Sequence, residues 1–244
     1  MERLLRATAR AEARHFWFRG FRAFVGPLVE IATAGRPAPL ILDCGCGTGA
    51  NVEWLGARGR AYGFDLSAAG LRLGREAGRR RLARASVVAA PFPDGAFDLV
   101  TSFDVLYSLD AVDERRAMAE MVRLLKPGGY AIVNVAAMPG LRGDHSVLSQ
   151  EVRRYRRREL RARLEAAGFT IERLTYTNAT LVPPLALARY LQRRRGLREE
   201  PREITVPPAP VNAILSAALQ VEAAWVRRFD APFGSSLLCL ARKP

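Results

Sequence analysis

A glycine-rich loop framed by carboxylates is the part of this sequence best suited to chemistry. It reads DCGCGTG over residues 43–49 and follows the apolar segment 40–42. Glycines let a backbone approach a ligand closely, and a helix that starts beyond them offers free N–H groups. Asp65 ends the next apolar segment, 22 positions after Asp43. These residues predict a ligand beyond the carboxyl ends of the strands of a doubly wound sheet.

The spacing of the glycines narrows the kind of loop. A dinucleotide site has G-x-G-x-x-G, whereas this loop has G-x-G-x-G with Asp43 two residues ahead. The pattern resembles the first motif of class I S-adenosylmethionine-dependent methyltransferases. Residues 91–100 (PFPDGAFDLV) resemble that family's turn and fourth strand, and residues 124–129 (LLKPGG) resemble the turn into its fifth. The resemblance covers about residues 38–178, and 236–242 fits the antiparallel last strand.

The resemblance implies S-adenosyl-L-methionine as cofactor and S-adenosyl-L-homocysteine as product. It implies that Asp65 holds the ribose, that Leu66 packs on adenine and that Phe103 lines the floor of the pocket. Many relatives place an acidic residue near the adenine amino group, but Ser86, next to Val87, stands there in this chain. The implied cofactor residues in this part of the chain are Asp43, Gly45, Cys46, Gly47, Gly49, Asp65, Leu66, Ser86, Val87 and Phe103.

A short segment near the N-terminus, His15 to Arg19, resembles the helical lid of a bacterial, small-molecule branch of this family (methyltransferase-11-like). In that branch a helix closes over the cofactor. Trp17 or Phe18 would then cover the methionine side, and Arg19 would pair with its carboxylate. The alternative is simple aromatic packing on the sheet.

The catalytic residues are harder to identify because the sulfonium leaving group is already activated. In-line methyl displacement needs mainly positioning, and a base only where the acceptor stays protonated. Tyr107 stands where many relatives carry a Glu-His pair. His145, next to Asp144, is a candidate general base, with a solvated loop histidine as the alternative. Tyr155 either faces the same pocket or packs at a helix start.

The three cysteines argue against a disulfide framework and against a zinc site. Cys44, Cys46 and Cys239 are too few and too badly spaced for either, so we expect no metal and a reducing, cytoplasmic location. Cys44 and Cys46 are interpreted as small packing residues of the loop.

Alternating apolar strand-like and helix-like segments must position these residues. They predict an α/β fold, a Rossmann-like doubly wound sheet of seven strands with helices on both faces and the last strand antiparallel. We expect a third strand at 86–88 and a fifth at 130–135. A single domain is predicted, with an N-terminal helical lid at 1–38, a cofactor-binding core at 39–178, a helical insertion at 179–230 and a closing strand at 231–244.

The formal net charge of +14 and the isoelectric point near 10.9 raise the question of an anionic partner. Seven arginines lie in 153–163. They form either a solvated face or an anion-binding surface. The amphipathic segment 211–228 could touch a membrane or cap the active site. We find no signal peptide and, from the spacing of charges, expect no membrane-spanning segment.

Together these features predict a methyltransferase that moves a methyl group to a small-molecule acceptor, on oxygen. Two alternatives stay open. An RNA or protein methyltransferase would use the arginine-rich surface, although no recognition module is seen, and a non-catalytic cofactor-binding protein would have lost chemistry at Tyr107. The oligomeric state is left open. The glycine spacing disfavours a nicotinamide dehydrogenase.

Overall fold

A mixed sheet forms the centre of the computed structural model, which describes residues 2–144, 146, 149–196 and 205–244. In these residues the strand order is β3-β2-β1-β4-β5-β7-β6, and β7 runs antiparallel to both of its neighbours. This confirms the predicted fold class. The strands are β1 (Leu40–Cys44), β2 (Arg60–Asp65), β3 (Leu82–Arg84), β4 (Phe97–Phe103), β5 (Leu125–Ala136), β6 (Thr170–Thr177) and β7 (Ser236–Arg242).

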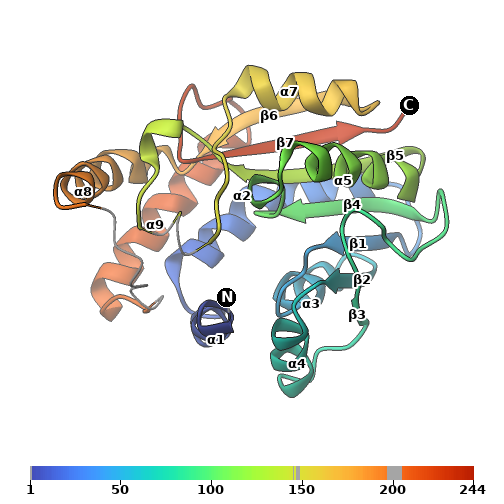
Figure 1. The fold of residues 1–244 in the computed structure, drawn as a ribbon, viewed down its shortest axis with the longest axis horizontal. Coiled ribbons are helices and arrows are strands. Elements are labelled where there is room, and N and C mark those ends of the chain that lie inside the picture. Colours follow the sequence, from blue (N-terminus) through green and yellow to red (C-terminus); the bar gives the residue numbers. More distant parts are fainter. Residues whose placement is uncertain (1, 145, 147–148, 197–204) are drawn as a thin grey trace.

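Helices cover both faces of the sheet (Figure 1). One face packs against α2 (Phe16–Thr33), α3 (Ala50–Leu55), α4 (Ala68–Glu76) and α9 (Ala209–Val226). The other packs against α5 (Ala111–Leu124) and α7 (Arg157–Ala166). The remaining elements are α1 (Glu2–Ala11), α8 (Val182–Arg194) and the short 3₁₀ helices η1 (Leu106–Ser108), η2 (Pro139–Leu141) and η3 (Ala179–Leu181).

The central strands are buried on both faces, as a doubly wound sheet requires. Every residue of β4 is buried, and β1 is buried from Ile41 to Cys44. Such strands carry near-continuous apolar runs, and this is why the sequence reveals them clearly. Their carboxyl ends meet along one edge of the sheet, where the glycine loop follows β1.

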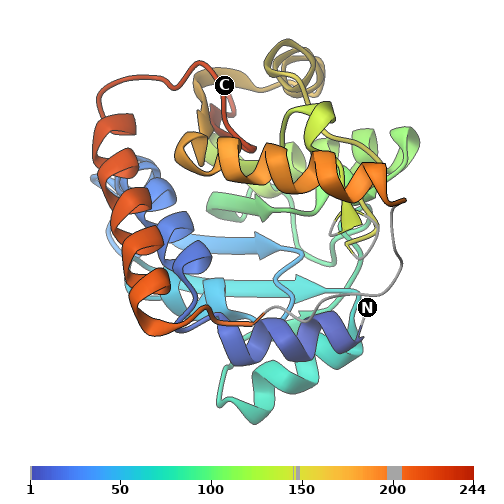
Figure 2. The ribbon, with the colours of Figure 1, turned by 90° about the vertical axis from the view of Figure 1, so that its left-hand side faces the viewer.

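The N-terminal helices are held by the last helix of the chain. The α2 and α9 helices pack together so closely that Leu219 fills the space a Cβ at Gly20 would need. Asn212, near the start of α9, accepts a hydrogen bond from the backbone N–H of Phe16 at 2.9 Å and donates one to the carbonyl of Arg14 at 3.0 Å. These contacts fix the junction between α1 and α2 (Figures 1 and 2).

Two expectations about single elements are wrong. The third strand is Leu82–Arg84, whereas residues 86–88 form a turn in which the hydroxyl of Ser86 accepts a hydrogen bond from the N–H of Val88. The second error concerns the spacing of charges, because no uncharged run of 18 or more residues was expected. Residues 204–221 carry no charge, and α9 is long and apolar enough by length and composition to cross a membrane. Only 28% of α9 is buried inside the fold, and it packs on α2 as a core helix would.

A buried ionic cluster accounts for part of the arginine-rich segment. Glu114 is fully buried and pairs with Arg153 at 2.7 Å and with Arg163. Tyr155 is also fully buried, and its hydroxyl donates to Glu114 at 2.5 Å. Tyr155 therefore has the packing role of the two that the sequence allowed. Arg157 pairs with Asp230, and Arg161 pairs with Glu165. Most arginines of this segment therefore make ion pairs or hydrogen bonds within the protein.

Candidate functional site

The glycine loop has a backbone that side chains would obstruct. Gly45, Gly47 and Gly49 all have positive φ, of 83°, 56° and 79°. This region of backbone space is costly for residues with a Cβ. At Gly45 the side chain of Val105 occupies the place of the missing Cβ, so the loop lies directly against the segment that follows β4.

Asp43 enters this loop as an incompletely satisfied buried carboxyl group. One oxygen accepts a hydrogen bond from the hydroxyl of Thr101 at 2.7 Å, and the other is buried without a hydrogen-bond partner. Burial raises the pKa of Asp43 to about 7. A cationic group beside the free oxygen would hold this carboxyl group ionised.

Asp65 closes the loop from the end of β2. Its two oxygens accept hydrogen bonds from the backbone N–H of Gly47 at 2.8 Å and of Ser67 at 2.7 Å. A carboxylate oxygen has two acceptor sites, so both can still receive a hydroxyl hydrogen. The adjacent Leu66 is 60% exposed, a surface on which a flat ring could pack.

The other sequence-predicted cofactor residues occupy different surroundings. Ser86 and Val87 lie just past β3, in the turn described above. Cys46 is buried in the loop, and its sulfur packs where a Cβ at Gly63 would lie. Phe103 is buried at the end of β4 and meets the ring of Phe21 edge-on, with centroids 4.9 Å apart.

S-adenosylmethionine fits these residues on two observations. The unpartnered oxygen of Asp43 can accept a hydrogen bond from an ammonium group. The backbone around Gly47 leaves open space, since among the described residues only Leu5 comes within 4 Å of a Cβ built there. Asp65 has spare acceptor capacity for ribose hydroxyls. Asp43, Gly47 and Asp65 are therefore the residues that would hold the cofactor.

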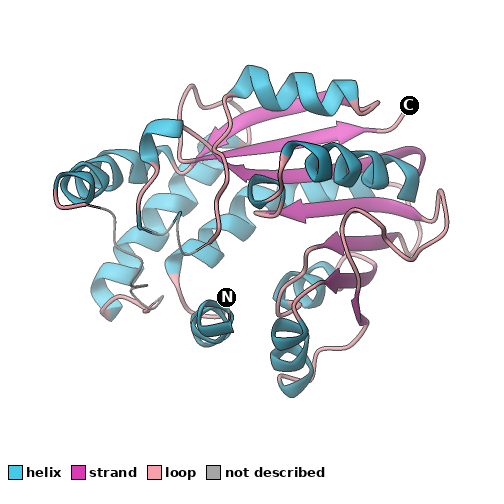
Figure 3. Cartoon of the chain, viewed as in Figure 1, coloured by secondary structure: helices cyan, strands magenta, loops and turns pink. Residues whose placement is uncertain are grey.

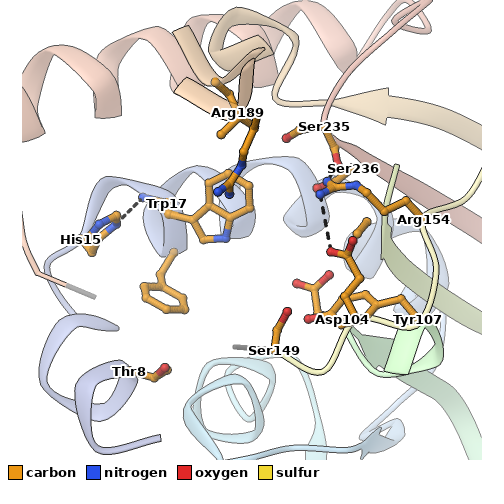
Figure 4. A pocket seen from close by; sticks show the side chains of 14 residues that line it. Thr8, His15, Trp17, Asp104, Tyr107, Ser149, Arg154, Arg189, Ser235 and Ser236 are labelled. Atoms are coloured by element: carbon orange, nitrogen blue, oxygen red, sulfur yellow. Dashed lines mark hydrogen bonds and ion pairs between the residues drawn. The ribbon is translucent and has the colours of Figure 1, made fainter. Parts of the chain in front are cut away.

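A cavity of about 450 Å³ lies beyond the ends of β4 and β5. Aromatic residues of α2 form one wall, residues that follow β4 and β5 form another, and α8 covers it (Figure 4). The residues lining it are Thr8, His15, Trp17, Phe18, Asp104, Tyr107, Ala136, Ser149, Glu151, Arg154, Leu185, Arg189, Ser235 and Ser236.

Asp104 is an ionisable group of this cavity, and it immediately precedes Val105, the residue that packs against the cofactor loop. Its φ is 61°, a left-handed conformation that is uncommon outside glycine and concentrates at functional sites. Its carboxyl group accepts a hydrogen bond from the side-chain amide of Asn134 at 3.0 Å. Burial raises the pKa of Asp104 to about 7. Sequence reasoning missed this residue, although it lies between Phe103 and Tyr107, which were both predicted as site residues.

Of the two predicted catalytic residues, the structure places Tyr107 in the cavity wall (Figure 4). Burial raises the pKa of the Tyr107 phenol well above its usual range, with the nearby Asp104 charge adding to the effect. The phenol therefore stays protonated and can donate a hydrogen bond. His145 lies outside the described residues.

Some residues of the predicted lid segment, His15 to Arg19, line the cavity, and others lie at the surface. Trp17 and Phe18 line the cavity, whereas Arg19 is exposed and is not among the lining residues. His15 caps α2, since its Nδ1 accepts a hydrogen bond from the N–H of Trp17 at 3.1 Å. Burial lowers the pKa of His15, which favours this neutral, accepting form.

Two arginines of the cavity were not predicted as site residues. Arg154 donates to the carbonyls of Ala137 and Ser235 and reaches Glu151 at 3.5 Å. Arg189 comes from α8, and its Nε is buried without a hydrogen-bond partner. No motif marks α8, and so nothing in the sequence indicated that it would cover this cavity.

Within the described residues, no group of three or more histidine, cysteine, aspartate or glutamate side chains is arranged to hold a metal ion. Cys44, Cys46 and Cys239 are buried, and their thiols are free.

Comparison with known proteins points to one family. Residues 42–133 match the family model described as a methyltransferase domain. The chain is 32% identical over 138 residues to the demethylmenaquinone methyltransferase of Symbiobacterium thermophilum, covering 50% of this chain and 51% of that protein. It is 31% identical over 133 residues to the ubiquinone/menaquinone biosynthesis C-methyltransferase of Pseudoalteromonas translucida, covering 49% and 50%. The chain thus spans about half the length of the curated relatives it matches.

Solved structures agree in fold over nearly the whole chain. An S-adenosylmethionine-dependent methyltransferase of Thermotoga maritima, described as a possible histamine N-methyltransferase, superposes with a TM-score of 0.60 at 18% identity, covering 99% of each chain. One from Mesorhizobium loti gives 0.55 at 20% identity, covering 90% of this chain and 97% of that one.

The fold and the glycine loop define a Rossmann-like domain of the type that binds S-adenosylmethionine. Within that class, the match of residues 42–133 to a methyltransferase domain and the solved neighbours support a class I S-adenosylmethionine-dependent methyltransferase, with S-adenosylmethionine as the methyl donor.

Proposed function

We propose that this chain transfers a methyl group to a small-molecule acceptor bound in the cavity between Trp17 and Tyr107. One observation carries the proposal. Val105 packs against the cofactor loop at Gly45, and Asp104, one residue earlier, lines the cavity. The two binding regions therefore meet at Asp104. A cavity of about 450 Å³ has the size of a small-molecule site.

S-adenosylmethionine, when bound, supplies a methyl group on a positively charged sulfur that leaves readily. The protein holds the acceptor in line with that methyl and excludes water. In its ionised form, which becomes the major form as the pH rises above about 7, Asp104 takes the proton of an acceptor hydroxyl. Tyr107 keeps its proton and donates a hydrogen bond that orients the acceptor.

The acceptor atom is proposed to be oxygen, because an acidic hydroxyl is the group that a base of pKa about 7 can deprotonate. A ring carbon next to such a hydroxyl is the second candidate. It is favoured by the curated relative whose name specifies C-methylation. Both products need the same deprotonation, and analysis of the methylated product separates them.

The lid is proposed to close the cofactor side. Arg19 is exposed on α2, from where it would pair with the methionine carboxylate, while Trp17 and Phe18 face the cavity. Arg19→Ala would then weaken S-adenosylmethionine binding, measured by calorimetry. An unchanged dissociation constant would remove Arg19 from the site.

The proposed reaction is tested by following S-adenosylhomocysteine release across a panel of phenols, hydroxyquinones, amines and RNA. We expect turnover with a hydroxylated small molecule, and loss of that turnover in Asp104→Asn. Glu76→Gln is the matched control, because Glu76 is an exposed acid on α4 away from the cavity. Methylation of RNA alone would contradict the proposal.

A further inference from the structure

The outward face of α9 is apolar and uncovered within the described structure. Ile214 is 69% exposed, Val221 is 72% exposed and Trp225 is 47% exposed. They recur at helical spacing on one side of the helix. The opposite side, with Leu219 and Ala223, is buried against the body of the domain. A water-soluble helix usually places charged residues on its outer face, so this side needs another explanation.

The neighbouring α8 has the same character on its outer side. Leu187 is 61% exposed, Tyr190 is 45% exposed and Leu191 is 56% exposed. Its other side carries Leu185 and Arg189, which line the cavity. Figure 2 shows α8 and α9 together on the side of the molecule that faces the viewer. We call the exposed apolar residues of these two helices the α8–α9 face.

The exposed charges on α8 and α9 and at their ends are mainly positive, with Asp230, just past α9, paired with Arg157 and Arg173. In the described ranges 179–196 and 205–229 the sole acidic residue is Glu222. It is buried, and its carboxylate accepts hydrogen bonds from the N–H groups of Ala179 and Thr180. Apart from Asp230, the exposed charged residues on the two helices and just past their ends are arginines: Arg194, Arg195, Arg227 and Arg228. Arg195 also reaches Asp144, and Arg227 comes within 3.9 Å of Glu30.

We propose that the α8–α9 face binds peripherally to an anionic lipid bilayer. An amphipathic helix lies in the interface when its apolar side enters the acyl boundary and nearby arginines meet anionic headgroups. Each such arginine adds attraction to an anionic surface, and the net charge of +14 acts in the same direction. The inner side of α9 stays packed on α2, so the helix lies on the membrane and does not cross it.

This placement sets one side of α8 against the bilayer and the other against the cavity. An apolar acceptor dissolved in the bilayer would have a short path to Trp17 and Tyr107. This consequence rests on the proposed function, whereas membrane binding does not. The competing occupant of the α8–α9 face is a second copy of the chain, which would bury the same apolar residues.

Co-sedimentation with vesicles tests the proposal without any acceptor. We expect the full chain to bind phosphatidylcholine vesicles in which about a third of the lipid is phosphatidylglycerol, and to bind pure phosphatidylcholine weakly. Val221→Glu should reduce the bound fraction at least about fivefold. Val112→Glu is the matched control, since Val112 is 47% exposed at the start of α5, on the other face of the sheet. Circular dichroism confirms that both variants fold.

Fluorescence adds a local readout. The emission of Trp225 should shift to the blue on anionic vesicles, and Trp225→Phe should lose that shift. Three results would overturn the proposal: no binding of the unchanged chain to anionic vesicles, equal binding by Val221→Glu and Val112→Glu, or a dimer in solution that Val221→Glu converts to a monomer. The last result would assign the α8–α9 face to a second copy.

Discussion

Asp104 and Asn134 join the ends of β4 and β5 through two hydrogen bonds. The Asn134 side-chain amide donates to the Asp104 carboxyl group at 3.0 Å, and the Asn134 carbonyl accepts from the Asp104 backbone N–H at 2.9 Å. This pairing holds Asp104 in its left-handed conformation with the carboxyl group in the cavity wall. It also places a carboxyl group with a pKa of about 7 next to the cofactor loop.

Asp104→Asn should therefore remove the proposed base. We expect kcat to fall by about 10²- to 10⁴-fold, the usual contribution of general-base catalysis. In the unchanged enzyme the base works only when ionised, so kcat should rise with pH and level off above about 7. The variant should lose this dependence while binding S-adenosylmethionine as before. A variant whose kcat rises through the same pH range would show that another group is the base.

The raised pKa of Asp43 leads us to expect that cofactor binding depends on pH. Its carboxyl group is mostly protonated below its pKa of about 7 and must ionise to pair with an ammonium group. Calorimetry should show S-adenosylmethionine binding about five to tenfold more tightly at about pH 7.5 than at about pH 6. Asp43→Asn should bind weakly at both values. Equal affinity of the unchanged protein at the two pH values would place the ammonium elsewhere.

Tyr155→Phe separates packing from catalysis. The substitution removes the hydroxyl that donates to buried Glu114, leaving an acceptor unpaired. We expect the free energy of unfolding to fall by about 1–3 kcal/mol in chemical denaturation. Because Tyr155 is not among the cavity-lining residues, kcat per folded molecule should not change. A large drop in kcat at unchanged stability would return Tyr155 to the active site.

Glu222→Ala should loosen the connection between α9 and η3. The carboxylate accepts hydrogen bonds from the N–H of Ala179, the N–H of Thr180 and the hydroxyl of Thr180, at 2.7, 2.9 and 2.7 Å. Its loss should lower the free energy of unfolding by about 1–3 kcal/mol. Gln220→Ala, on the exposed side of the same helix, is the control and should change it little. Similar melting curves for the two variants would mean that solvent replaces these hydrogen bonds.

The sequence predicted those parts of the fold that are encoded locally. The strand before the glycine loop and the strand from Phe97 are apolar runs buried on both faces, and both were found where expected. The strand Leu82–Arg84 was missed because it is a short edge strand ending in an arginine. Ser86 to Val88 has more β-branched character, but the Ser86 hydroxyl bonds its own turn instead.

The residues of the candidate site also differ in whether local sequence encodes them. Asp43 and Asp65 belong to a motif, so their neighbourhood was predictable. Asp104 acquires its properties from a backbone conformation and from Asn134, which lies thirty residues later. Arg189 enters the cavity only because α8 folds back over it, and that depends on packing between distant segments. Local patterns do not encode such relationships.

The bond between Phe16 and Asn212 joins residues 196 positions apart, and it has a consequence for the order in which the molecule can form. During synthesis α1 and α2 emerge first, but the helix that holds them emerges almost last. The parallel strands β1 to β5 can pair before then, because their partners are closer in sequence, whereas β6 has to wait for β7. The lid must wait for α9. A nascent chain that stops short of residue 209 would therefore leave the side of α2 that faces α9 uncovered.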